Sequence, residues 1–156
     1  MEEAARLATT ADITELVSLA RVGRDAIRDA RGGAMWLARQ APPGPLPDMF
    51  EAAITEPESA VHLGCIDDVP LGFILARIAD GEPRIAVVEE LFVLPEARGV
   101  GLGEHMMNAT IDWAAANSCS GVDGYALPGD RATKNFFETF GLVARGIVVH
   151  RRIGDE

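Results

Sequence analysis

The chain has 156 residues, 48% of them hydrophobic, and its 24 acidic and 14 basic residues give a formal net charge of -10. This length is typical of one domain with a substantial core, so we expect a single domain over residues 1–156. The acidic excess disfavours nucleic-acid binding and mildly favours a cationic small molecule or peptide as partner. We find no apolar run of membrane-spanning length and no signal-like start, which predicts a cytoplasmic protein without membrane contact.

The cysteines and histidines do not have the spacing of metal ligands. Cys65 and Cys119 lie far apart without a CxxC pair, so we expect buried free thiols rather than a disulfide or a zinc site. His62, His105 and His150 are scattered along the chain and are interpreted as structural or surface residues. The sequence therefore predicts no metal centre.

The first third of the chain is mainly helical in pattern. A short strand near residues 6–8 precedes a helix over residues 13–23 that Thr10 or Asp12 can cap. The helical pattern resumes over the next seven residues and stops at two glycines. Residues 32–48 are expected to form a mobile loop with a helical piece inside it, followed by a short helix over residues 47–57.

The remainder predicts a sheet covered by helices. Three apolar runs with tight connections indicate an antiparallel meander, and a later strand connected through a helix should join it in parallel. The expected strands are residues 60–66, 71–79, 84–94 and 121–127, and the expected helices are residues 104–117 and 131–140. Asp130 should cap the last helix and Gly141 should end it, and residues 142–153 should form one bent strand or two short ones.

A basic glycine-rich loop follows the third strand of the meander, with the sequence Arg-Gly-Val-Gly-Leu-Gly at residues 98–103. Such a loop at a helix start can bind phosphate groups through its backbone N–H groups. The dinucleotide fingerprint needs a third glycine where Glu104 stands, and a P-loop needs Gly-Lys-Ser/Thr where His105 follows Glu104. Neither of these two phosphate loops fits the spacing.

The spacing instead resembles the acetyl-CoA-binding motif of the GNAT superfamily of N-acyltransferases, Arg/Gln-x-x-Gly-x-Gly/Ala. Its fixed positions are filled by Arg98, Gly101 and Gly103. Downstream, residues 128–142 are similar to the second coenzyme motif of the family, with Asp130 at its Asn position and Phe137 at its Tyr position. The resemblance extends over about residues 5–153 and implies an α/β (α+β) domain with a mixed, mostly antiparallel sheet.

The resemblance implies attack of an amine on the thioester carbonyl of acetyl-CoA, assisted by a base. Glu89 and Glu90 in the strand before the loop are the candidates, with Glu89 preferred. Adjacent strand residues point to opposite faces unless a bulge intervenes, and the resemblance implies such a bulge. The alternative interpretation, that both carboxylates solvate a strand face or bind an arginine, carries equal weight for either residue alone.

The coenzyme contacts implied by the resemblance combine backbone and side-chain groups. The backbone at Phe92 or Val93 would donate to the oxyanion, and the same strand edge would pair with the pantetheine amides. Arg98 is the expected partner of the pyrophosphate. The complete expected set is Leu91, Phe92, Val93, Arg98, Gly99, Val100, Gly101, Leu102, Gly103, Asp130, Lys134 and Asn135.

The departing thiol has no obvious proton donor, because Phe137 stands where the family often has a tyrosine. Either Tyr125, the only tyrosine, supplies the proton, or the thiolate leaves with help from water. Met35 and Trp36 are candidates for the wall of an acceptor pocket, although both residue types more commonly pack in cores. The region after Gly141 is short for the family, which suggests that a second copy completes the site in a homodimer.

Two other functions stay open on sequence grounds. The missing tyrosine is compatible with a non-catalytic acyl-CoA sensor or regulatory module. A nucleotide-binding domain of another fold is the third possibility, and the failed loop spacings argue against it. The leading hypothesis is an N-acetyltransferase that uses acetyl-CoA as co-substrate and no metal, and acts on a primary amine of a small molecule or peptide.

Overall fold

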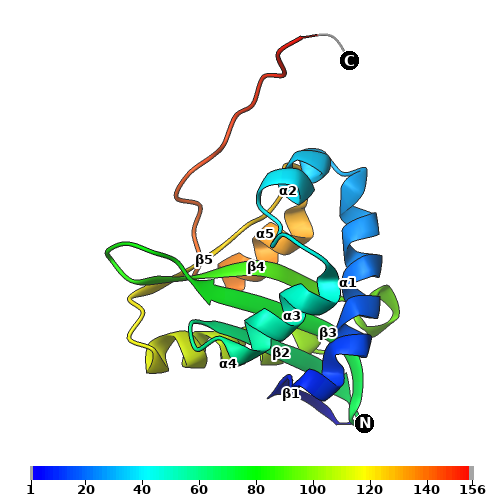
Figure 1. The fold of residues 1–156 in the computed structure, drawn as a ribbon. Coiled ribbons are helices and arrows are strands. Elements are labelled where there is room, and N and C mark those ends of the chain that lie inside the picture. Colours follow the sequence, from blue (N-terminus) through cyan, green and yellow to red (C-terminus); the bar gives the residue numbers. More distant parts are fainter. Residues whose placement is uncertain (1, 155–156) are drawn as a thin grey trace.

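The fold is a five-stranded sheet with helices on both faces, seen in a computed structural model that describes residues 2–154 (Figure 1). The strands follow one another across the sheet in chain order. They are β1 (Glu3–Leu7), β2 (Ser59–Ile66), β3 (Val69–Ile78), β4 (Ile85–Val93) and β5 (Gly121–Gly124). The helices are α1 (Ile13–Arg28), α2 (Gly33–Arg39), α3 (Leu46–Thr55), α4 (Leu102–Ala116) and α5 (Arg131–Thr139), with 3-10 turns at Thr10–Asp12 and Pro95–Ala97.

Strands β1 to β4 are antiparallel neighbours, and β5 pairs with β4 in parallel. Asp67 and Asp68, both with positive φ, connect β2 to β3, as a two-residue hairpin turn requires. The α4 crossover brings β5 back beside β4, as a strand-helix-strand unit demands. The mixed, mostly antiparallel α/β sheet predicted from the sequence is therefore confirmed.

A bulge interrupts β4 where its two glutamates lie. Leu75 of β3 is opposite Glu90, whereas the next residue, Ala76, is opposite Val88. Glu89 is thus the additional residue of β4 in this ladder. Because one extra residue reverses the alternation of side chains beyond it, the bulge changes which face the following residues of β4 occupy.

The two faces of the sheet carry separate cores. Helices α1 and α3 cover one face, where Phe50, Leu63 and Phe73 are fully buried. On the other face α4 packs across β1 to β3, and Met106 and Met107 are fully buried with Ile74. In Figure 1, α1 and α3 lie in front of the strands and α4 lies behind them. This two-sided burial is the main stabilising feature, because apolar area removed from water contributes about 25 cal/mol per Å².

Several boundaries differ from the sequence predictions. The helical segments predicted on both sides of Gly23 form one continuous helix, α1. A capping box of Thr9 and Asp12 starts the preceding 3-10 turn, one residue before the predicted Thr10. Asp12, the other predicted cap, is the N-cap residue of α1 but makes no side-chain cap hydrogen bond. Residues 32–48 contain all of α2 and the start of α3, and Cys119 is only half-buried rather than buried.

The end of the chain departs most from expectation. Residues 142–153 were expected to form strands, but no strand is assigned after α5 within the described residues. Figure 1 shows this segment leaving the body beyond α5 and β5. Leu142 still packs against the α4 core, but the large aliphatic side chains after it are 78 to 88% exposed: Val143, Ile147, Val148, Val149 and Ile153. A strand needs a backbone partner, and none of the strands in the described part of the chain pairs with this segment.

Candidate active site

A hollow of about 980 Å³ lies between α1, α2, the end of β4, the start of α4 and α5. It opens where β4 and β5 separate, since their ladder ends at the pair Val88 and Gly124. Beyond this point the edge of β4 toward β5 has no strand partner among the described residues. The hollow thus brings one sheet edge, one helix start and one face of α1 to the same space.

Both glutamates of β4 line this hollow and both lie on the α1 face of the sheet. Glu89 Oε1 accepts a hydrogen bond of 2.9 Å from Nε of Arg77, a β3 residue that shares its face with Phe73 and Leu75. Glu90 forms an ion pair with Arg24 of α1. The bulge implied by the resemblance is present, and it places two consecutive carboxylates on one side.

The glycine loop and the start of α4 form the opposite end of the hollow. Gly99 and Gly101 have φ of 85° and 90°, a left-handed conformation that favours glycine. A Cβ on either would meet no atom within 4 Å, so the space above the loop is open. Gly101 precedes α4, whose first N–H groups have no intrahelical acceptor, and an anionic group such as a pyrophosphate fits there.

Arg98 connects this loop to the end of β4. Its Nε donates to the carbonyl oxygen of Val93 at 2.9 Å, and its guanidinium lies 5.8 Å from the centre of the Phe92 ring. Leu91, Phe92 and Val93 all line the hollow with their strand edge toward β5 unpaired. These backbone groups can therefore pair with the amides of an extended ligand lying between the strands.

The third side of the hollow comes from the segment between β5 and α5 and from α5 itself. Tyr125 lines it and is 51% exposed, whereas Phe137 lines it from a buried position. Asp130 also lines it and caps α5, accepting a hydrogen bond from the backbone N–H of Thr133 at 3.0 Å. A hydroxyl is thus available from Tyr125 but absent at position 137.

The model of the acetyltransferase (GNAT) family matches residues 27–142, about three quarters of the chain. The chain belongs to the GNAT acetyltransferase family. The matched region contains β2 to β5, the glycine loop and α5, and most of the residues that line the hollow lie within it. A search of curated protein sequences finds no match.

Solved structures of low sequence identity share the fold over nearly the full length of both chains. A tetramutant of the BH1408 protein from Bacillus halodurans has a TM-score of 0.79 at 18% identity, covering 96% of this chain and 99% of that one. The aminoglycoside acetyltransferase AAC(6')-Iy, in complex with the bisubstrate analog CoA-S-monomethyl-acetylneamine, has 0.72 at 18% identity, covering 99% and 100%. A ribosomal-protein-alanine N-acetyltransferase from Brucella melitensis has 0.70 at 17%, covering 98% and 100%.

Not every residue expected to contact the coenzyme lines the hollow of this GNAT domain. Val100, Lys134 and Asn135 are absent from its lining, and Lys134 instead forms an ion pair with Glu138 one turn along α5. Gly103 lines it, but a Cβ there would also lie 3.0 Å from the Phe136 ring. Gly103 therefore permits close packing of α4 against α5.

At the α1 and α2 end of the hollow, the sequence indicated one residue that lines it, and it missed Gly23, which also lines it, and Arg24, which binds Glu90. Trp36 is buried and lines it, whereas Met35 does not. Gly23 and Arg24 of α1 were not singled out, although Arg24 follows Ala20 by four residues on the apolar stripe of the helix. A charged residue on a buried helical stripe signals a buried partner, and that signal could have found Arg24.

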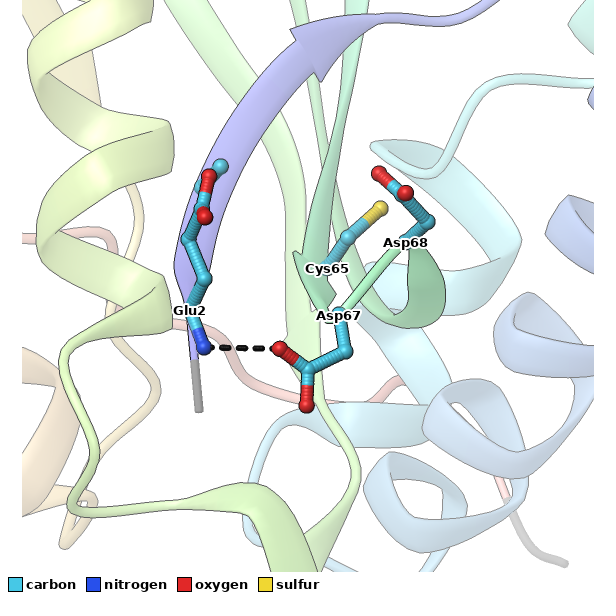
Figure 2. Close-up of a pocket in the computed structure, with 5 residues that line it drawn as sticks. Glu2, Cys65, Asp67 and Asp68 are labelled. Carbon is cyan, nitrogen blue, oxygen red and sulfur yellow. Dashed lines mark hydrogen bonds between the residues drawn. The ribbon is translucent and has the colours of Figure 1, made fainter.

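A second, smaller hollow of about 230 Å³ lies at the β2–β3 turn beside the N-terminus (Figure 2). It is lined by Glu2, Cys65, Asp67 and Asp68 among others, and the Glu2 N–H donates to Asp67 Oδ1 at 2.8 Å. Burial raises the pKa of the Cys65 thiol above its usual range, which disfavours a nucleophilic thiolate. In residues 2–154 there is also no group of three or more side chains suited to hold a metal, and no helix is long and apolar enough to cross a membrane.

Proposed function

We propose that this chain transfers an acetyl group from acetyl-CoA to a primary amine of a small molecule or peptide. The observation that carries the proposal is the β4 bulge, because it brings Glu89 and Glu90 to the same face, in a hollow whose other end is the open glycine loop. A base and a phosphate-binding loop at opposite ends of one hollow suit a long thioester donor and an amine acceptor.

In the proposed reaction the amine nitrogen attacks the thioester carbonyl carbon, forming the C–N bond while the C–S bond breaks. Glu89 takes the proton that the amine must lose, directly or through water. The side chain of Glu89 is 12% exposed, so its carboxylate works in a restricted volume beside β4. Backbone N–H groups at Phe92 or Val93 stabilise the negative charge that develops on the carbonyl oxygen.

The sulfur leaves as a thiolate and takes a proton from Tyr125 or from water. Tyr125 is the hydroxyl-bearing residue that we assign to this step, because it lines the hollow beyond the last paired residues of β4 and β5. A thiol pKa of about 8.5 makes the thiolate a tolerable leaving group even without a strong acid. The proposed reaction therefore does not need a tyrosine at position 137, where this chain has Phe137.

The adenosine and pyrophosphate end of acetyl-CoA is assigned to the loop from Arg98 to Gly103. The fit rests on the open space above Gly99 and Gly101 and on the orphan N–H groups at the start of α4. Binding there would place the pantetheine along the free edge of β4. No residue of this chain is required to hold a metal in the proposed reaction.

A thermal-shift screen of acetyl-CoA, CoA, ATP and NAD, followed by an amine panel read out as released thiol, tests the proposal. Acetyl-CoA should raise the melting temperature more than ATP or NAD, and at least one amine should release CoA. Stabilisation by acetyl-CoA without turnover on a broad panel would instead support the non-catalytic acyl-CoA sensor. Stabilisation by ATP or NAD alone would overturn both.

We also propose that the protein works as a homodimer, with the segment from Val143 to Gly154 of each copy resting on the other. The segment holds three arginines and no acidic residue, whereas the chain as a whole is strongly acidic. Its Arg145 forms an ion pair with Asp123 of β5, an edge strand of the sheet, and its exposed aliphatic side chains follow this contact along the chain. A basic, apolar segment rich in β-branched residues is complementary to the acidic body of a second copy.

Light scattering of the full chain tests this assembly. A dimer that becomes monomeric in Val148→Asp, with the exposed α1 variant Val22→Asp as control, is the expected result. A monomer at all concentrations, or a dimer unaffected by Val148→Asp, would contradict the assignment.

A further inference from the structure

Arg24 on α1 holds Glu90 by two contacts in the interior of the domain. Arg24 Nη2 contacts Glu90 Oε1 and Arg24 Nε donates to Oε2 at 3.3 Å. The side chains are 17% and 6% exposed. A guanidinium that engages both oxygens leaves this carboxylate little freedom to turn toward a substrate.

The same guanidinium also reaches the chain segment between α2 and α3. Nη2 of Arg24 donates to the carbonyl oxygen of Pro42 at 3.3 Å. This segment follows Trp36, which lines the hollow at its acceptor end. Arg24 therefore connects three separate parts of the domain: α1, β4 and the wall that an acceptor would meet.

The residue before Arg24 fixes the distance between α1 and β4. A Cβ on Gly23 would lie 3.0 Å from Cγ of Phe92, so the helix approaches the strand as closely as a glycine allows. Phe92 and Glu90 are two residues apart on β4 and share one face. The close approach at Gly23 thereby places Arg24 above Glu90.

Glu89 has a different environment. Its partner Arg77 contacts Oε1 alone and is 60% exposed, and within residues 2–154 no side chain or backbone N–H donates to Glu89 Oε2. Of the two carboxylates, Glu89 thus keeps an oxygen free for a substrate proton.

We infer that Arg24 is a positioning residue that immobilises Glu90 and shapes the acceptor wall through Pro42, so that proton transfer falls to Glu89. This inference rests on the proposed acetyl transfer. It separates the roles of the two carboxylates: Glu89 acts on the substrate, and Glu90 is the anion that anchors Arg24. The acceptor affinity, rather than the chemical step, should then depend on Arg24.

Steady-state kinetics of full-length variants test the division of roles. Arg24→Gln and Glu90→Gln should each raise KM for the amine about tenfold and leave KM for acetyl-CoA within about twofold, with the pH profile of kcat unchanged. Glu89→Gln should lower kcat instead. Arg24→Lys keeps the charge but loses the planar guanidinium that binds both oxygens of Glu90, so its KM for the amine should lie between those of wild type and Arg24→Gln. The exposed Arg21→Gln serves as control.

A lone buried charge can prevent folding, so the double variant Arg24→Gln, Glu90→Gln provides a second route to the same comparison. A loss of kcat with an altered pH profile in Glu90→Gln would make Glu90 the base and overturn the inference. An unchanged KM for the amine in Arg24→Gln would overturn it as well.

Hydrogen exchange supplies a measurement that does not need activity. Amides of the peptide covering residues 33–46 should exchange faster in Arg24→Gln than in wild type, and no faster in Arg21→Gln or Glu89→Gln. Equal exchange in Arg24→Gln and wild type would overturn the positioning role even if the wild-type protein transfers no acetyl group. Failure of the proposed function is read separately, from the amine panel.

Discussion

Glu89 and Glu90 are consecutive in sequence yet both project to the α1 face of the sheet, where Arg77 and Arg24 bind them. In a regular strand they would lie on opposite faces. The bulge opposite Leu75 and Ala76 removes this constraint. With both carboxylates on one face, Glu90 can bind Arg24 while Glu89 faces the space proposed for the acceptor.

Glu89→Gln removes the proposed base and keeps the size of the side chain. We expect kcat to fall by about 10²- to 10⁴-fold, the range that general-base catalysis contributes, with little change in the melting-temperature shift caused by acetyl-CoA. The exposed Glu138→Gln on α5 is a matched control. Full activity in the double variant Glu89→Gln, Glu90→Gln would remove both candidates from the mechanism.

Arg98→Ala should weaken coenzyme binding by about tenfold, or about 1.4 kcal/mol, because it removes a charge beside the loop and the hydrogen bond to Val93. The measurement is the concentration dependence of the acetyl-CoA thermal shift, with Arg21→Ala as control. Identical shifts in Arg98→Ala and wild type would show that the pyrophosphate lies elsewhere.

Tyr125→Phe tests the proton donor to the thiolate. We expect kcat to fall by about tenfold, at the low end of acid-base contributions, since water can partly replace the hydroxyl. Phe137→Tyr in the same background places a hydroxyl at another point on the same side of the hollow and should restore part of the loss. An unchanged kcat in Tyr125→Phe would mean that water, rather than Tyr125, donates the proton to the leaving thiolate.

His62 should make folding stability depend on pH near neutrality. It is buried on β2, its Nδ1 has no hydrogen-bond partner among residues 2–154, and desolvation lowers its pKa below the ordinary 6.5. As pH falls, His62 therefore becomes protonated at a higher pH in the unfolded chain than in the folded one. Stability is fully present above pH 6.5 and falls as pH decreases below it, by up to about 1.4 kcal/mol per unit.

Denaturant unfolding between pH 5 and pH 8 measures this slope. His62→Leu removes both the proton site and the orphaned nitrogen, so its slope in this range should be smaller. The exposed His105→Gln should retain the wild-type slope. Equal slopes in wild type and His62→Leu would assign the pH dependence to other groups.

Asp12 should stabilise the start of α1 at neutral pH. Its hydrogen bond from Arg6, followed by that from the Thr9 backbone, lowers its pKa to about 2. This contribution is present above pH 4, the unfolded value, and is lost as pH falls toward 2. Asp12→Asn should cost about 1–2 kcal/mol at pH 7, and the difference from wild type should shrink in acid.

Chemical unfolding at pH 7 and at low pH measures this difference. The exposed pair of Asp25 and Arg28 gives the control, Asp25→Asn, whose cost should stay below about 1 kcal/mol. A cost for Asp12→Asn that is independent of pH would mean that the carboxylate charge is not the stabilising feature.

Local signals in the sequence determined much of this protein. The meander of β2 to β4, the glycine loop before α4, the Asp130 cap and the Gly141 stop follow from apolar periodicity and from residue-specific backbone chemistry. These properties depend on neighbours along the chain. For the same reason the spacing of Arg98, Gly101 and Gly103 was sufficient to indicate the GNAT family.

The tertiary structure decided what depends on residues far apart in sequence. The face on which Glu89 and Glu90 lie depends on the register of β4 against β3, and a register cannot be read from one strand. The pairing of Arg24 with Glu90 depends on how closely α1 docks at Gly23, and the segment after Gly141 forms no strand because a strand requires a partner. The chemistry of the hollow is therefore set by packing between elements.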